Sequence, residues 1–272
     1  MVKIRDVIGE IEAVAPLPLQ EDFDNAGIQV GDIQSEVTGV LLCLDVTEEV
    51  IDEALDLKCN LIISHHPLIF KPIKSITGKT YIERCIRKAC KHDLVVYSAH
   101  TNLDNAWGGV SFRMAGKLGL QNIRTLSPVH ASAIDADSEP DALLKAGTGA
   151  IGELLLPEDE ASFLQTIKTV FHLDTLKHSQ LCNKKIHSVA VCGGSGAFLL
   201  PEAIACEADV FITGEAKYND FYDAENHILL VVAGHYETEI FTKELFFEII
   251  TKKIPTFAVH FSNADTNPVN YI

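Results

Sequence analysis

The sequence predicts an α/β protein made of two related lobes. Short runs that are apolar at every position alternate with amphipathic stretches, once before residue 125 and again after residue 184. Strands that are apolar throughout are typical of parallel sheets covered by helices on both faces. We therefore expect an N-terminal lobe over 1–125, a connecting segment with a strand and a helix over 126–184, and a C-terminal lobe over 185–272, all within one compact unit.

The N-terminal lobe begins with apolar residues at helical spacing, and Pro16 and Pro18 then end the helix. Thr47 is placed to cap a later helix. The expected elements are, in order, a helix over 4–14, a turn-rich stretch over 23–32, a strand over 39–45, a helix over 48–57, a strand over 60–64, a helix over 80–91 and a strand over 94–98.

The rest of the chain continues this pattern. The connecting segment is expected to hold a turn-rich stretch over 127–141, a strand over 149–156 and a helix over 159–173. The C-terminal lobe is expected to hold strands over 185–192, 209–213, 227–233 and 255–260, and helices over 201–208, 217–225 and 235–253.

The composition excludes several classes of protein. The formal charge is 22 − 38 = −16, and 47% of the residues are apolar. These values indicate a folded domain and disfavour an extended nucleic-acid face or an anionic membrane surface as partner. There is no membrane-spanning run and no signal-peptide pattern, and the seven cysteines contain no C-x-x-C pair. A cytoplasmic location is therefore expected.

Two adjacent histidines carry the clearest chemical signal. His65 and His66 follow the strand over 60–64, at the carboxyl edge where open α/β sheets bind their ligands. Adjacent side chains point in different directions, which suits two metal ions ~3.5–4 Å apart better than one. The alternative is a pair of loop histidines that bind nothing.

Two further motifs also follow predicted strands. In HTNLDNAWGG, Asp104 offers a carboxylate and His100 a polar partner, although a carboxylate here is also typical of a turn or helix cap. In GHYETE, His235 and Glu239 are four residues apart, so both side chains lie on the same face of the first helical turn. Without a metal, Glu239 would still complement the helix N-terminus.

Together these motifs predict a metal centre. Three histidines and two carboxylates suit two divalent ions such as Zn, Fe, Mn, Co or Ni. The predicted ligands are His65, His66, Asp104, His235 and Glu239.

Other residues are weaker candidates for the surroundings of this centre. Asp45 would orient a ligand histidine or cap the helix that follows it. Lys217 would bind an anionic substrate group or is a solvated surface side chain. The glycine-rich run over 192–198 is either an anion-binding turn or a plain turn before a helix.

These motifs, in this order, resemble the Nif-three-like dinuclear metal centre family, whose bacterial members are often labelled GTP cyclohydrolase I type 2 homologues. The resemblance extends from the first helix to the C-terminus, and SHHPLIF and GHYETE are its most specific parts. The chain departs from the family at two positions. Phe23 stands where the family commonly has Trp, and Asn219 stands where it often has a second His.

The resemblance implies a two-lobed fold that is mainly a three-layer α-β-α sandwich, without the large inserted domain of longer members. It implies two divalent metal ions per subunit, held by the five predicted ligands, with Glu239 and His66 taking part in catalysis. It also implies a toroidal homohexamer with the metal sites facing its interior, and a small-molecule substrate such as GTP or another nucleotide.

The leading hypothesis is a metal-dependent hydrolase in which a metal-activated water attacks the substrate, at C8 of guanine if the cyclohydrolase label applies. A metal-dependent phosphoesterase and a non-catalytic metal-binding regulatory or scaffold protein are the alternatives. Two divalent ions would outweigh the charges of Asp104 and Glu239, so an acidic chain would still attract a single nucleotide.

Overall fold

The computed structural model of the chain describes residues 2–128, 145–265, 267–270 and 272. The chain forms two compact units, one containing Met1–Leu103 and Thr242–Ile272 and the other Asp104–Phe241. These units divide the chain at different points from the predicted boundaries. The physical reason is that the last strand pairs with a strand of the first sheet, although the sequence pattern suggested the C-terminal lobe for it.

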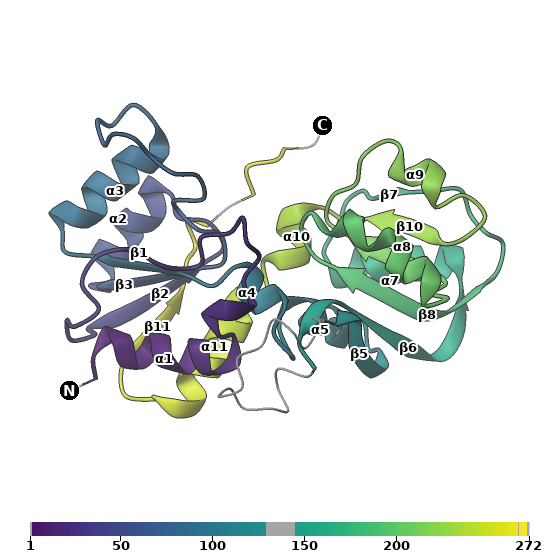
Figure 1. Ribbon diagram of the computed structural model, residues 1–272, viewed down its shortest axis with the longest axis horizontal. Helices are drawn as coiled ribbons and strands as arrows, with labels where there is room; N and C mark the ends of the chain where they lie inside the picture. The colour runs from purple at the N-terminus through teal and green to yellow at the C-terminus, as the bar shows by residue number, and fades with distance from the viewer. Residues whose placement is uncertain (1, 129–144, 266, 271) are drawn as a thin grey trace. The chain divides into compact units, whose positions relative to one another are not determined.

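The first unit is a five-stranded sheet between two layers of helices (Figure 1). The strand order is β1-β4-β3-β2-β11, in which only the edge strand β1 is antiparallel to its neighbour. Helices α2 and α3 cover one face and α1 and α11 the other. The elements are α1 (Ile4–Val14), the 3₁₀ turn η1 (Leu17–Leu19), β1 (Gly27–Val30), β2 (Gly39–Cys43), α2 (Glu48–Asp56), β3 (Leu61–Ser64), α3 (Tyr81–Lys91), β4 (Val95–Ser98), α4 (Thr101–Asp104, which leads into the second unit), α11 (Thr242–Lys253) and β11 (Ala258–Phe261).

The apolar runs of the first unit form its core as predicted. Every residue of β2, β3 and β4 is buried, and the Thr47 side chain accepts a hydrogen bond from the Val50 N–H at the start of α2. The turn-rich stretch over 23–32 contains strand β1, which the sequence pattern did not reveal. Because β1 is a short edge strand with an exposed Ile28, it has no apolar run.

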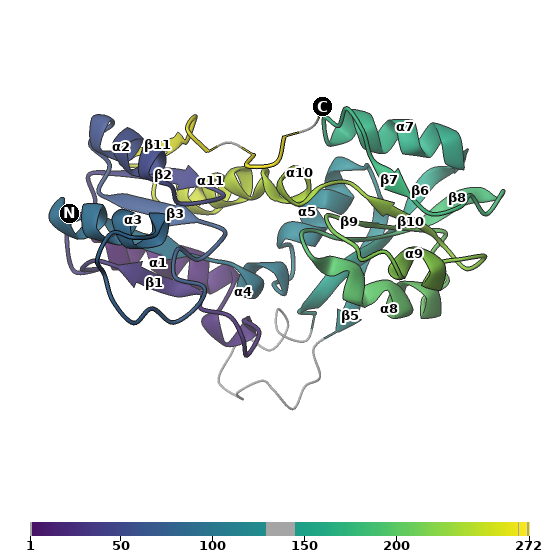
Figure 2. The same ribbon diagram turned by 90° about the horizontal axis from the view of Figure 1, so that it is seen from above.

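The second unit contains a six-stranded mixed sheet of order β5-β6-β8-β9-β10-β7. Strands β8, β9 and β10 are parallel, while β5, β6 and β7 run antiparallel to their neighbours. Helices α8 and α9 lie on one face of this sheet and α7 on the other (Figure 2). The elements are α5 (Val110–Lys117), β5 (Gln121–Pro128), β6 (Gly147–Asp159), α7 (Glu160–Val170), β7 (Lys177–His178), β8 (Lys185–Cys192), the 3₁₀ turn η3 (Gly196–Leu199), α8 (Leu200–Ala205), β9 (Val210–Thr213), α9 (Asp220–Asp223), β10 (Leu229–Val232) and α10 (His235–Glu239).

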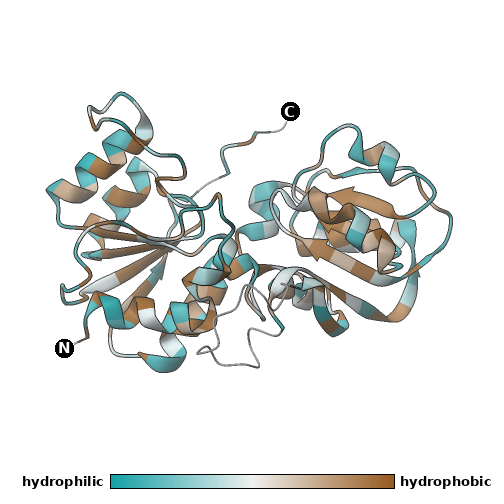
Figure 3. Ribbon diagram, viewed as in Figure 1, coloured by the Kyte–Doolittle hydropathy of each residue, from teal (hydrophilic) through white to brown (hydrophobic). Residues whose placement is uncertain are grey.

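The predicted connecting segment is part of this second sheet. Its strand and helix are β6 and α7, while most of the turn-rich stretch over 127–141 lies outside the described residues. The central strands of both sheets are the most hydrophobic parts of the chain (Figure 3). Among the described helices, none is both long and apolar enough to cross a bilayer.

Candidate metal centre

Two parallel strands of the first unit bring three histidines to the same edge. Strands β3 and β4 end in register, with Ser64 opposite Ser98, and the hydroxyl oxygens of these serines lie 2.8 Å apart. The Ala99 N–H donates to the Ser64 carbonyl at 3.0 Å and extends the pairing by one residue. His65 and His100 follow directly from this fixed edge, as expected for the carboxyl ends of parallel strands.

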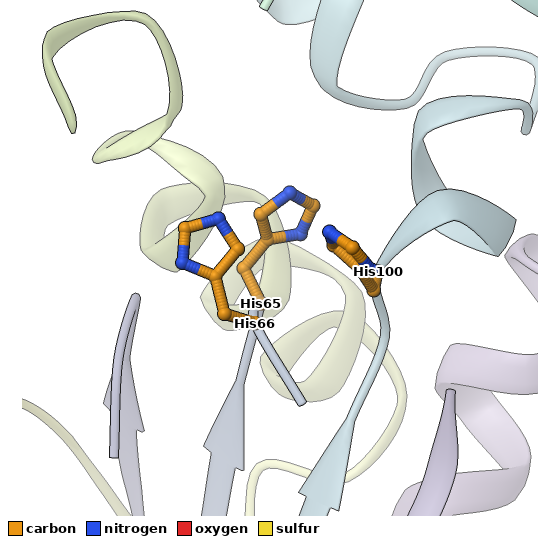
Figure 4. Close-up of side chains that lie close together, drawn as sticks. All are labelled: His65, His66 and His100. Carbon is orange, nitrogen blue, oxygen red and sulfur yellow. The ribbon is translucent and has the colours of Figure 1, made fainter. Parts of the chain in front are cut away.

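His65, His66 and His100 form a compact cluster (Figure 4). Their ring centroids lie 5.1 to 5.5 Å apart, and one nitrogen from each ring lies within 4.8 Å of the others. His65 is fully buried, and the other two are partly buried. The cluster could therefore hold a metal ion, and His100, which was predicted as a polar partner, is one of its three members.

Each imidazole of this cluster is oriented through Nδ1 by an oxygen acceptor. Because the acceptor is a carbonyl or carboxylate oxygen, the proton of the neutral ring is held on Nδ1 and the lone pair is left on Nε2, the atom that would bind a metal. The three contacts are His65 to the Ala99 carbonyl at 2.9 Å, His66 to Asp45 Oδ1 at 2.9 Å and His100 to Asp24 Oδ1 at 2.8 Å.

Asp24 is a residue that the sequence patterns did not identify. Its side chain has no exposed surface, and besides His100 it accepts hydrogen bonds from the N–H groups of Asn25 and Thr101. Burial alone would raise the pKa of Asp24, but the donors on His100 and Thr101 outweigh it and lower the pKa to about 2. Asp24 is therefore a fixed anion behind the His100 ring.

In the second unit, His235 and Glu239 face each other across one turn of α10. His235 Nε2 lies 3.0 Å from Glu239 Oε2, which confirms the predicted shared face, and the Glu239 side chain is nearly fully buried. His235 Nδ1 lies 3.0 Å from Glu215 Oε1, and the Ser195 hydroxyl donates to Glu215 Oε2 at 2.7 Å. A continuous chain of polar contacts thus runs from Ser195 to Glu239.

Two glycines leave space for the side chains in this chain of contacts: Gly194, in the glycine-rich run over 192–198, and Gly214. Gly194 has φ +55°, and a Cβ there would lie 2.2 Å from Glu239 Oε1. A Cβ on Gly214 would lie 2.9 Å from the Cα of His235. The Gly194 N–H donates to Thr238 Oγ1 at 3.1 Å, so this turn serves to pack against α10.

Asp104 belongs to the second unit. Burial raises the pKa of the Cys192 thiol, and the charges of Asp104 and Glu239 raise it further. Lys217 is exposed, and its backbone N–H donates to the Asp220 carboxylate at 2.6 Å. The five predicted ligands belong to both units, and their assembly into one centre stays a prediction.

Comparisons with known proteins agree over nearly the whole chain. Residues 2–268 match the family model of Duf34/NIF3 (NGG1p interacting factor 3). A Clostridium acetobutylicum protein named GTP cyclohydrolase 1 type 2 homolog is 36% identical over 239 residues, which are 88% of this chain and 85% of that protein. A Lactococcus lactis protein of the same name is 32% identical over 275 residues, which cover 98% of this chain and 98% of that protein. The crystal structure of a Bacillus cereus protein related to NIF3 matches with a TM-score of 0.89 at 25% identity, over 100% of this chain and 99% of that one.

Proposed function

Because the chain belongs to the Duf34/NIF3 family, we propose that it binds divalent metal ions and hydrolyses a nucleotide or a similar small molecule. One observation supports the metal sites most strongly. Nδ1 of His65, His66, His100 and His235 each contacts an oxygen acceptor, an arrangement that metal-binding histidines almost always show.

The donor atoms also fit such ions. Imidazole nitrogens with one or two carboxylates suit Zn, Fe, Mn, Co or Ni rather than Mg or Ca, which prefer oxygen alone. We propose two ions per chain, with His65, His66, Asp104, His235 and Glu239 as ligands. His100 is a sixth ligand candidate, because its ring nitrogen lies in the first cluster.

A divalent ion, when bound, lowers the pKa of a coordinated water towards ~7, which is the chemistry that hydrolases use. The residues of this chain prepare the ligands for it. In the neutral rings, Nδ1 of His66 donates to Asp45 and Nδ1 of His100 donates to Asp24, which leaves the lone pair of each Nε2 for a metal. Glu239 and His66 are the residues to which we assign roles in catalysis.

The substrate that we propose is GTP or another nucleotide, following the name that the relatives share. The assembly that we propose is a toroidal homohexamer, which the family resemblance implies.

Turnover tests this proposal. Protein loaded with Mn, Zn or Fe is expected to release formate from GTP, and Glu239→Ala and His65→Ala variants are expected to lose this activity. Release of phosphate without formate would identify a phosphoesterase instead. Equal activity in the wild type and both variants, or no turnover across nucleotides and phosphoesters, would contradict a hydrolase.

A further inference from the structure

Two exposed phenylalanines stand beside the first histidine cluster. We propose that Phe23 and Phe70 hold the planar base of a nucleotide, one ring stacking on its face and the other meeting its edge, and that the phosphates of this nucleotide bind Lys71 and Lys74. This inference rests on the proposed function, because it assigns the substrate class of the same site to particular side chains.

The two rings form an aromatic surface at the cluster. Phe23 is 67% exposed and Phe70 is 40% exposed, with ring centroids 6.4 Å apart and an angle of 73° between the rings. The Phe70 ring also lies edge-on to the ring of His100, at 5.9 Å between centroids. A planar ligand that reaches the histidines would therefore meet one aromatic face, on which any nucleobase can stack, and a second ring nearly perpendicular to it.

Hydrogen bonds fix the two backbone segments that carry these rings. Asn25 Nδ2 donates to the Ile69 carbonyl at 2.7 Å, and the Ile69 N–H donates to Gln29 Oε1 at 3.1 Å. Gln29 Nε2 in turn donates to the Asn25 carbonyl at 2.6 Å. The segments that carry Phe23 and Phe70 are thus tied together next to each ring, so both rings are held at the surface without being covered.

The loop that follows Phe70 carries positive charge, which an anionic substrate needs. Residues 66–82 contain three lysines and no acidic residue, within a chain of net charge −16. Lys71 and Lys74 are exposed, and no ion pair of either ammonium is recorded among the described residues. The far end of the loop is fixed, because Glu83 accepts the N–H groups of Thr77 and Gly78. Phosphates of a ligand stacked on Phe70 would find these two lysines available.

A fluorescent nucleotide tests both parts of this site. Stacking on an aromatic ring quenches 2-aminopurine, so the emission of 2-aminopurine riboside triphosphate is titrated with the metal-loaded full chain. The wild type is expected to quench the probe, and the double variant Phe23→Leu/Phe70→Leu to bind it about 5- to 150-fold more weakly, as the loss of stacking worth ~1–3 kcal/mol per base predicts. Phe261→Leu is the control, because Phe261 is 41% exposed on β11 and is expected to leave binding unchanged.

The lysines are tested with the same probe and two fragments of it. Lys71→Ala/Lys74→Ala is expected to weaken binding of the triphosphate probe and of tripolyphosphate, and to leave the free 2-aminopurine riboside unchanged. Equal weakening of the triphosphate and the free riboside would overturn the assignment of the lysines to phosphate. Thermal unfolding of every variant shows that it is folded.

The metal content of the same samples separates this inference from the proposed function. Metal-loaded wild type that does not quench the probe, or a phenylalanine double variant that binds it as tightly as the wild type, would overturn the inference alone. Wild type that quenches the probe but takes up no metal would support the nucleotide site and contradict the proposed metal chemistry.

Discussion

The two histidine sites are oriented by the same kind of contact but rest on different supports. In the first unit, His65 and His100 follow buried parallel strands, and Asp24 holds the His100 ring from a fully buried position. In the second unit, His235 stands on a five-residue helix, and Glu215, which is 57% exposed, holds it. We therefore expect changes to the first site to cost folding stability, whereas the carboxylate that orients the second site should matter mainly for metal affinity.

The largest expected effect tests the glycine turn that supports the second site. Gly194→Ala would place a Cβ against the Glu239 carboxylate at a left-handed backbone position. We expect a loss of about 3 kcal/mol in the free energy of unfolding, from backbone strain and overpacking together, measured by urea denaturation.

Gly108→Ala is the matched control for this change. Gly108 has φ +80° and no heavy atom within 4 Å of the added Cβ, so only the backbone strain of about 1 kcal/mol applies. Equal losses for the two variants would show that Glu239 does not depend on the glycine turn.

The next effect concerns the buried support of the first site. Asp24→Asn would turn an amide N–H₂ towards the donors on His100, Asn25 or Thr101. We expect a loss of about 2 kcal/mol in stability and a loss of about 10- to 100-fold in metal affinity, measured by denaturation and by metal titration. Asp22 is an exposed neighbour, so Asp22→Asn should change neither the free energy of unfolding nor the metal affinity. An Asp24→Asn protein with the stability and metal affinity of the wild type would refute the orienting role of Asp24.

Glu215→Gln tests the carboxylate that orients His235 in the second unit. Because Glu215 is largely exposed, we expect the free energy of unfolding to change by less than about 0.5 kcal/mol. Metal affinity should nevertheless fall by about 10- to 100-fold, since the contact with His235 Nδ1 loses its charge. Calorimetric metal titration measures this, with the exposed Glu225→Gln as control, and a stability loss as large as that of Asp24→Asn would remove the distinction between the two sites.

The smallest effect is expected at Ser195. The hydrogen bond from Ser195 is the largest cause of the lowered pKa of Glu215, so Ser195→Ala should raise that pKa towards the ordinary glutamate value. A lowered carboxyl pKa stabilises the fold above the ordinary pKa, and this contribution is lost as the pH falls through the lowered value. In the variant the Glu215 carboxyl should therefore protonate at higher pH, which an NMR titration of its side chain would detect. An unchanged titration would show that Ser195 does not control Glu215.

Local patterns were sufficient to predict the elements that carry the chemistry. The apolar runs predicted the buried strands before His65 and His235, and the spacing of four residues predicted the shared face of His235 and Glu239. These features depend on residues close together in the sequence, so periodicity reveals them.

Contacts between distant segments could not be predicted in this way. Asp24 and His100 are 76 residues apart, and they meet because the edge strand β1 pairs with β4. The pairing of β11 with β2 and the antiparallel strands of the second sheet likewise have no local signal. Asp24 lies in the turn-rich stretch over 23–32, but nothing in its spacing linked it to a histidine.

The most direct test of the central claim is a titration of the metal-free full chain with Co²⁺, followed by visible absorption and elemental analysis. If histidines oriented through Nδ1 hold the metal, the d–d absorption should saturate at two ions per chain, and it should be lost in His65→Ala/His66→Ala. Absence of the absorption and of stoichiometric cobalt uptake in the wild type would contradict the account.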